Sequence, residues 1–115
     1  MIIITENTTL ENIKKLEKTS FFPDMVKAVV DIEQELIAVN GELHADLEEL
    51  LLNNGSKQQS LYGINIYFGN GEIEFDSMIN PPRNLEAGFP RGGRGVADPI
   101  AREKIVKVVN KWITI

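Results

Sequence analysis

Two alternating apolar runs joined by a glycine-rich turn decide the fold: Tyr62-Gly-Ile-Asn-Ile-Tyr-Phe68, then Gly69-Asn70-Gly71, then Ile73-Glu-Phe-Asp-Ser-Met-Ile79. Alternation of this kind is typical of strands with one buried face. Asn-Gly between such runs is the strongest short hairpin signal. We therefore predict a hairpin with a two-residue Asn70-Gly71 turn, which pairs Phe68 with Ile73, Ile66 with Phe75, Ile64 with Ser77 and Tyr62 with Ile79.

The opposite face of this hairpin is polar, with Asn65 across from Asp76, Tyr67 across from Glu74, and Asn80 beyond them. These side chains are candidates for a concave ligand site. If a second hairpin lies next to the first, Asp76 forms paired carboxylates with Asp31 or Glu33, an arrangement suited to general acid–base catalysis. The alternative is that this is the solvated face of a two-layer domain.

The second hairpin is predicted within residues 25–39, where β-branched residues are dense. A turn near Gln34 and Glu35 pairs Ile32 with Ile37 and Val30 with Val39. One face of this hairpin is then apolar, and Asp31 and Glu33 lie on the other.

A short strand at Ile2–Thr5 and a first helix are predicted before that hairpin. The segment Thr8-Thr-Leu-Glu11 fits a capping box, with Thr8 as N-cap. We expect the helix to end near Thr19.

A second helix is predicted from Leu43 to Asn53, with Leu43, Leu47, Leu50 and Leu51 as its buried stripe. Asn54-Gly55 is a typical helix stop. The last helix is predicted to start at Asp98-Pro99, because aspartate is a good N-cap and proline fits the first helical position. Its buried stripe is Ala101, Ile105, Val108 and Trp112.

The predicted fold class is α+β, with the element order β-α-β-β-α-β-β-α. We expect residues 1–115 to form a single two-layer domain, with an antiparallel or mixed sheet and helices packed on one face. The length of 115 residues is usual for one domain. The 43% apolar and 25% charged residues are ordinary for a globular protein.

The net charge and the cysteine content of the chain argue against several classes of function. The net charge of −5 argues against general binding to nucleic acid, which needs clustered Lys and Arg. Cysteine is absent, which excludes disulfides, Cys-rich zinc sites and cysteine nucleophiles. The apolar N-terminal run of four residues is too short for a membrane span or a signal-peptide core, so we expect a cytoplasmic protein without a membrane partner.

Several motifs together resemble a known family: Met25-Val-Lys-Ala-Val-Val-Asp-Ile-Glu33, Gly41-Glu-Leu-His-Ala-Asp46, Asn54-Gly-Ser-Lys-Gln58, Leu61-Tyr-Gly-Ile-Asn-Ile-Tyr67, Ser77-Met-Ile-Asn-Pro81 and Asp98-Pro99. The family is catalogued as domain of unknown function 5674. The resemblance covers roughly residues 25–112. It implies a compact single domain and no established activity, substrate or cofactor.

Residues 80–97 are predicted to be one long loop, and loops of this length are usually functional or disordered. It carries three arginines in an acidic chain, and Arg matches phosphate or carboxylate well. Its glycines let backbone N–H groups approach an anion. Ligand-binding candidates here are Asn80, Arg83, Arg91, Gly92, Gly93 and Arg94. The alternative is a glycine-rich surface loop with its arginines in solvent.

His44 is the only histidine and lies where the second helix is predicted to begin. Histidine can act as a general base near neutral pH. Glu48 lies one helical turn away and Asp46 is close in sequence, so either is a candidate to orient the ring. The alternative is a capping or partly buried histidine.

Three functional hypotheses follow. The favoured one is a binding module in which the loop 80–97 captures a small anionic ligand or an acidic protein segment. The second is a small hydrolase or transferase with His44 as base, Asp46 or Glu48 as its orienter, and Arg91 and Arg94 as an anion clamp. The third is a structural protein that forms a homodimer. No metal or cofactor is predicted.

Overall fold

A five-stranded antiparallel sheet forms the centre of the fold in the computed structural model, which describes residues 1–16, 21–89 and 93–115. The strand order is β1-β4-β3-β5-β6, and every neighbouring pair is antiparallel. The strands are β1 Ile2–Ile3, β3 Met25–Asp31, β4 Leu36–Val39, β5 Leu61–Tyr67 and β6 Ile73–Glu74. The predicted α+β class with an antiparallel sheet is therefore confirmed.

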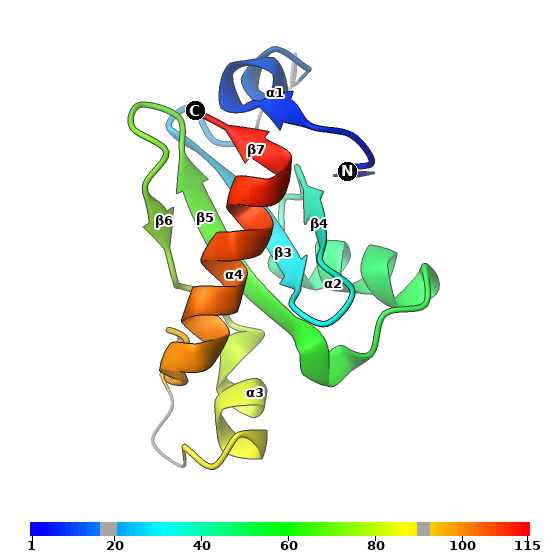
Figure 1. Cartoon of the computed structure of the whole chain (residues 1–115), viewed down its shortest axis with the longest axis vertical. Coiled ribbons are helices and arrows are strands. Elements are labelled where there is room, and N and C mark those ends of the chain that lie inside the picture. The colour runs from blue at the N-terminus through cyan, green and yellow to red at the C-terminus, as the bar shows by residue number, and fades with distance from the viewer. Residues whose placement is uncertain (17–20, 90–92) are drawn as a thin grey trace.

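Helices cover both faces of this sheet, and Figure 1 shows α4 in front of it and α2 behind it. The helices are α1 Leu10–Leu16, α2 His44–Asn53, α3 Asn80–Glu86 and α4 Pro99–Trp112, with a 3-10 turn η1 at Gln58–Ser60. No helix in the described part of the chain is long and apolar enough to cross a membrane.

The expectation that helices pack on one face is wrong, and β3 shows why. On one face Ala28 and Val30 pack with residues of α1 and α4. On the other face Val29 packs with Leu47 and Leu51 of α2. Three successive apolar residues are typical of a strand that is buried on both sides. The molecule therefore has three layers.

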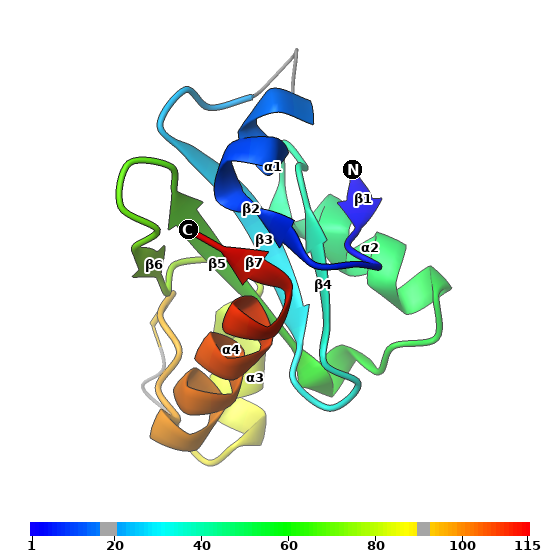
Figure 2. The same ribbon diagram turned by 45° about the horizontal axis from the view of Figure 1, so that its top comes forward.

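The element order also differs from the predicted one at both chain ends. The strands β2 Thr8–Thr9 and β7 Ile113–Thr114 form a separate parallel pair, which lies beside α1 (Figure 2). Thr9 caps α1, since its Oγ1 accepts the N–H of Asn12 at 3.0 Å, so the helix starts one residue later than predicted. The predicted helix end near Thr19 lies outside the described residues.

The first hairpin forms with a register two residues away from the predicted one. Val30 pairs with Ile37, and Asp31 pairs with Leu36. Asp31 sets this register, because its Oδ1 accepts the N–H groups of residues 33 and 34, both at 2.9 Å. The resulting turn spans residues 32–35. A shift of two residues keeps the same side chains on each face.

The second hairpin is shifted in the same way. Ile66 pairs with Ile73, and residues 68–71 form the turn, with Gly71 at a φ of 72°. Strand β6 has only two residues, so the predicted pairs of Ile64 with Ser77 and Tyr62 with Ile79 do not form. The outer edge of β5 is consequently not covered by β6 before Asn65.

Helix α3 replaces the first part of the predicted loop 80–97. Its two prolines occupy the first helical turn, where a missing N–H costs nothing. Gly88, at a φ of 91°, follows the helix and donates its N–H to the Leu85 carbonyl at 3.0 Å. At the next helix the sequence prediction is confirmed: Asp98 caps α4 by accepting the N–H of Ile100 at 2.9 Å.

Candidate functional site

Asn80 lies in the interior of the fold, where it completes the edge of β5. Its Oδ1 accepts the N–H of Gly63 at 2.8 Å, and its Nδ2 donates to the Gly63 carbonyl at 3.0 Å. Nδ2 also donates to the carbonyl of Arg94 at 2.9 Å. The side-chain amide thus takes the place of a paired strand residue, and Asn80 is fully buried. Its observed contacts are structural.

Arg83 is also buried, with 4% of its surface exposed. Its Nε donates to the Leu61 carbonyl at 3.1 Å, and its Nη2 forms an ion pair with Glu48 of α2. Burial lowers the pKa of Arg83, and Glu86 acts in the opposite direction. Its charge is already matched by Glu48, so Arg83 joins α3 to the core and is not available to an anion.

The glycine-rich segment after α3 is held by Asn84. The Asn84 Oδ1 accepts the N–H of Ala97 at 3.0 Å, while its Nδ2 donates to the carbonyls of Gly93 and Gly95 at 3.1 and 2.9 Å. The candidates Arg91 and Gly92 lie outside the described residues. The Gly93 carbonyl is thus engaged by Asn84, although the residue itself is exposed.

His44 begins α2 and lies on the sheet with 8% of its surface exposed. Its Nε2 is 2.8 Å from the Ile64 carbonyl oxygen. A carbonyl only accepts, so Nε2 carries the proton, and Nδ1 of the neutral ring is an acceptor. Gly63 leaves room for the ring, because a Cβ at this position would lie 3.1 Å from His44 Cδ2.

Burial is the largest influence on His44 and lowers its pKa below the ordinary 6.5. The hydrogen bond to Ile64 acts to raise the pKa, and Lys27 lowers it again. The negative charge of Asp76 and a side-chain hydrogen bond between the protonated ring and Asn65 raise it to a smaller extent. The net result is a histidine that is neutral at pH 7.

The structure gives no role to the two residues predicted to orient the His44 ring. Glu48 forms its ion pair with Arg83, and Asp46 is only partly buried in the first turn of α2. The Ile64 carbonyl therefore orients the imidazole. His44 nevertheless lies close to the second hairpin, since Asp76 and Asn65 both influence its protonation.

A row of three polar residues crosses the sheet beyond the N-terminal end of α2. Lys27 of β3 lies opposite Asn65 of β5, which lies opposite Glu74 of β6. Asn65 Nδ2 donates to Glu74 Oε1 at 2.8 Å, and the Tyr67 hydroxyl donates to the same oxygen at 3.2 Å. Burial and the Glu74 carboxylate raise the pKa of Tyr67, which keeps this hydroxyl protonated.

Two groups in this row lack an expected partner. Asn65 is 4% exposed, yet its Oδ1 has no hydrogen-bond partner among the described residues. Lys27 forms no ion pair with any described carboxylate, and its Nζ lies 4.9 Å from the centre of the Phe22 ring. Arg94, by contrast, pairs with Asp76 through Nε and Oδ1 at 3.0 Å.

We call this region the polar face and define it by Lys27, His44, Asn65, Tyr67, Glu74 and Asp76, with the more exposed Arg94 at its rim. Sequence reasoning predicted most of these residues, although it placed Asn65 opposite Asp76. It missed Lys27. The available signal was a lysine within the otherwise apolar run from Met25 to Val30.

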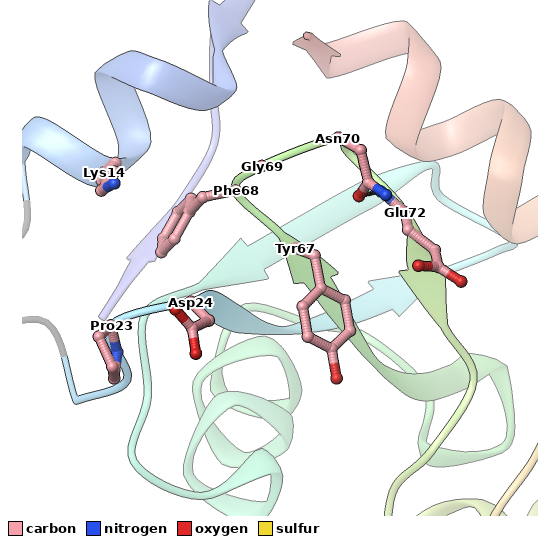
Figure 3. Close-up of a pocket in the computed structure, with 8 residues that line it drawn as sticks. All are labelled: Lys14, Pro23, Asp24, Tyr67, Phe68, Gly69, Asn70 and Glu72. Carbon is pink, nitrogen blue, oxygen red and sulfur yellow. Dashed lines mark hydrogen bonds between the residues drawn. The ribbon is translucent and has the colours of Figure 1, made fainter.

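A hollow of about 430 Å³ adjoins the polar face at Tyr67 (Figure 3). In Figure 3 the Tyr67 ring points away from Phe68, which lies toward α1. Lys14 of α1 stands 5.5 Å from the centre of the Phe68 ring. The lining residues are Lys14, Pro23, Asp24, Tyr67, Phe68, Gly69, Asn70 and Glu72. Its charges are mixed, and its lining includes neither Lys27 nor Asn65.

The carboxylates predicted to join Asp76 lie near the other end of the sheet. Asp31 pairs with Leu61, four residues along β5 from Asn65. Asp31 Oδ2 accepts the Ser56 hydroxyl at 2.7 Å, and Glu33 accepts the Ser60 hydroxyl at 2.8 Å. The paired-carboxylate arrangement is thus not formed. Within the described ranges no three His, Asp or Glu side chains gather as a metal site would require.

The fold and the polar face together define a small α+β protein with a three-layer core and one polar surface beside a buried histidine. The chain belongs to the family described as "Protein of unknown function (DUF5674)", whose model matches residues 2–112. This membership confirms the resemblance carried by the sequence motifs. No curated protein and no solved structure matches the chain.

Proposed function

We propose that the protein is a binding module for a small anionic ligand, and that the ligand lies on the polar face against Lys27. One observation carries this proposal: Lys27 is partly buried on the polar face and forms no ion pair with a described carboxylate, its ammonium group lying over the Phe22 ring. Arg94 pairs with Asp76, and Glu74 accepts two hydrogen bonds. An anion bound at Lys27 would give this ammonium group an ion-pair partner.

The position of Lys27 strengthens its attraction for an anion. The residue is partly buried and lies in the central strand β3, next to buried Asn65. Coulombic attraction grows as the surroundings become less water-like. The whole chain carries a charge of −5, so an anion is held by a local cation and not by the overall field.

Arg94 is the described residue through which the segment 80–97 contributes to this proposal. Its side chain is 58% exposed and is bonded side-on to Asp76. An exposed pair of this kind contributes little stability and rearranges easily. We therefore assign Arg94 a secondary role, as a second positive charge at the rim.

The first prediction tests Lys27 by calorimetric titration with phosphate, sulfate and acetate. We expect at least one of these anions to bind, and Lys27→Met to weaken its binding about tenfold or more, because the substitution keeps the chain length and removes the charge. Charge-assisted hydrogen bonds contribute about 1.5–3 kcal/mol, which corresponds to this range. Arg94→Ala should weaken binding by a smaller factor.

Lys57→Met is the matched control. Lys57 is exposed, lies just before η1, and forms no ion pair with a described carboxylate. Its loss removes the same charge from the chain without touching the polar face. Equal anion affinity in wild type and Lys27→Met, or equal losses in the two lysine variants, would contradict the proposal.

A second candidate function is acid–base catalysis on the same surface, and the state of His44 favours it. The Nε2–H group of the neutral ring donates to the Ile64 carbonyl, so Nδ1 is the atom that can accept a proton from a substrate. Asp46 and Glu48 take no part in this acid–base mechanism. Turnover of a bound anion that disappears in His44→Gln, with its binding intact, would distinguish catalysis from binding alone.

A further inference from the structure

We propose that the anionic ligand also carries a hydrogen-bond donor, a hydroxyl or amino group, and that Asn65 Oδ1 accepts it. This inference rests on the proposed function and deepens it, because it names the class of anion. Its basis is independent of Lys27: it is the unpartnered oxygen of a side chain that is 4% exposed.

A buried acceptor without a partner is costly. Most buried polar side-chain atoms in folded proteins have at least one hydrogen-bond partner, because an unpaired atom loses its hydrogen bonds to water without replacement. The orientation of the Asn65 amide is fixed by Glu74, since a carboxylate accepts only from Nδ2. Turning the amide over would place two oxygens against each other. Oδ1 is therefore the atom left toward His44.

The donors around Oδ1 are already used. His44 directs Nε2–H to the Ile64 carbonyl, and the Tyr67 hydroxyl donates to Glu74. The Nδ1 atom of neutral His44 is itself an acceptor. Only a protonated His44 could donate to Oδ1, and while the ring is neutral the described residues supply Oδ1 with no donor. A donor on the ligand would satisfy it.

The row across the sheet fixes how such a ligand would be oriented. Lys27 lies on one side of Asn65 and Glu74 on the other. Adjacent strands are about 4.8 Å apart. The distance between the Lys27 and Asn65 polar atoms can differ from this spacing, because the lysine side chain is flexible. A small acid with its donor on the neighbouring carbon can place its anionic group at Lys27 and its donor at Asn65. An amino group would gain further from the negative charge of Glu74.

Access to Oδ1 requires side chains at the rim to move, because the atom is shielded from solvent. Lys27, Glu74 and Asp76 are each only partly buried. Changes of side-chain rotamer are common on binding even where the backbone is unchanged. The proposal therefore needs no movement of the sheet.

The second prediction compares acetate, glycolate and glycine in the same titration. The three share a carboxylate, and only the last two carry a donor on the next carbon. We expect glycolate and glycine to bind about tenfold more tightly than acetate, the size of one net hydrogen bond. In Asn65→Leu the ratio of glycolate to acetate affinity should fall to about one while acetate affinity is kept, and glycine should retain only the part of its preference that comes from Glu74. Asn110→Leu, on the exposed side of α4, is the control and should leave the ratio unchanged.

Equal binding of the three compounds to the wild type would overturn this inference, and would mean that water satisfies Oδ1. A preference for glycolate over acetate that survives in Asn65→Leu would overturn it as well. If Asn65→Leu does not fold, Asn65→Ala replaces it, and the wild-type ratio remains a complete test. Absence of binding for all three carboxylates and for phosphate, or binding that Lys27→Met leaves unchanged, would instead be a failure of the proposed function.

Discussion

Gly63 shows how one residue controls the candidate site. It lies in the middle of β5, beneath both His44 and Ser77. A Cβ on this residue would lie 2.4 Å from Ser77 Cβ and 3.1 Å from His44 Cδ2. The first distance is far below van der Waals contact, so a side chain here would push Ser77 and the imidazole away from the sheet. The missing side chain is what allows His44 to reach the Ile64 carbonyl.

The third prediction is that Gly63→Ala destabilises the protein by about 1–3 kcal/mol, the usual cost of overpacking a filled core. Urea denaturation measures this free energy of unfolding. Gly69→Ala is the matched control, since a Cβ at Gly69 meets nothing within 4 Å. We expect it to change stability by less than about 0.5 kcal/mol. Equal effects of the two substitutions would refute the close packing seen at Gly63.

Single residues also show where sequence reasoning succeeds and where it stops. It identified Asn65 and Asp76 because polar side chains stand out within apolar alternation, and His44 because it is the only histidine of the chain. It could not separate a ligand-binding arginine from a structural one. Arg83 and Arg94 come from the same predicted loop, and only their partners, Glu48 in the core and Asp76 at the rim, distinguish them.

At the scale of elements, α3 is the part that the sequence concealed. Two prolines followed by glycine-rich sequence indicate a loop, and a seven-residue helix is too short to show a periodic pattern. The hairpins were recognised by their alternation, but their registers depend on four-residue turns fixed by Asp31 and by the chain around Gly71. The Asp98-Pro99 start of α4 was predictable because capping is a local property.

The fourth prediction concerns the attachment of α3 to α2. Arg83→Met would leave the carboxylate of Glu48, 14% exposed, without its partner. Breaking a buried pair on one side costs about 3–5 kcal/mol, and the partial exposure of Glu48 favours the lower end. The double variant Arg83→Met, Glu48→Leu should recover part of the loss, because no unpaired charge remains. A double-mutant cycle from urea denaturation measures the coupling.

The exposed pair of Glu11 and Lys15 on α1 serves as the comparison for that cycle. Their side chains are 75% and 71% exposed, at a distance of 3.4 Å. Lys15→Met should change stability by less than about 1 kcal/mol, as is usual for surface pairs. If Arg83→Met costs no more than Lys15→Met, α3 is not anchored through this ion pair.

At the scale of the whole molecule, the chain ends stabilise the same layer. Strand β2 near the N-terminus pairs with β7 at the C-terminus, and Asn7 Nδ2 donates to the Lys111 carbonyl at 3.1 Å. Ile113 of β7 is buried in the core with α1 and α4. The Cα radius of gyration of 13.0 Å is close to the value of about 13 Å expected for a compact domain of this length. The polar face lies on the other side of the sheet from α1 and α4, beside the part of that side that α2 covers.

The fifth prediction is that the stability of the whole protein decreases as the pH falls below about 6.5. His44 is the single histidine, and its pKa in the folded protein is lowered by burial. Between the folded pKa and 6.5 the unfolded chain binds more protons than the folded one, so the free energy of unfolding rises with pH across that window. Urea denaturation from about pH 7 to about pH 5.5, above the usual range of carboxylates, measures the slope. The His44→Gln variant should show a nearly flat profile. A wild-type protein whose stability is constant or increases as the pH falls would mean that His44 is not held neutral against the sheet, and the acceptor role of Nδ1 on the polar face would fall with it.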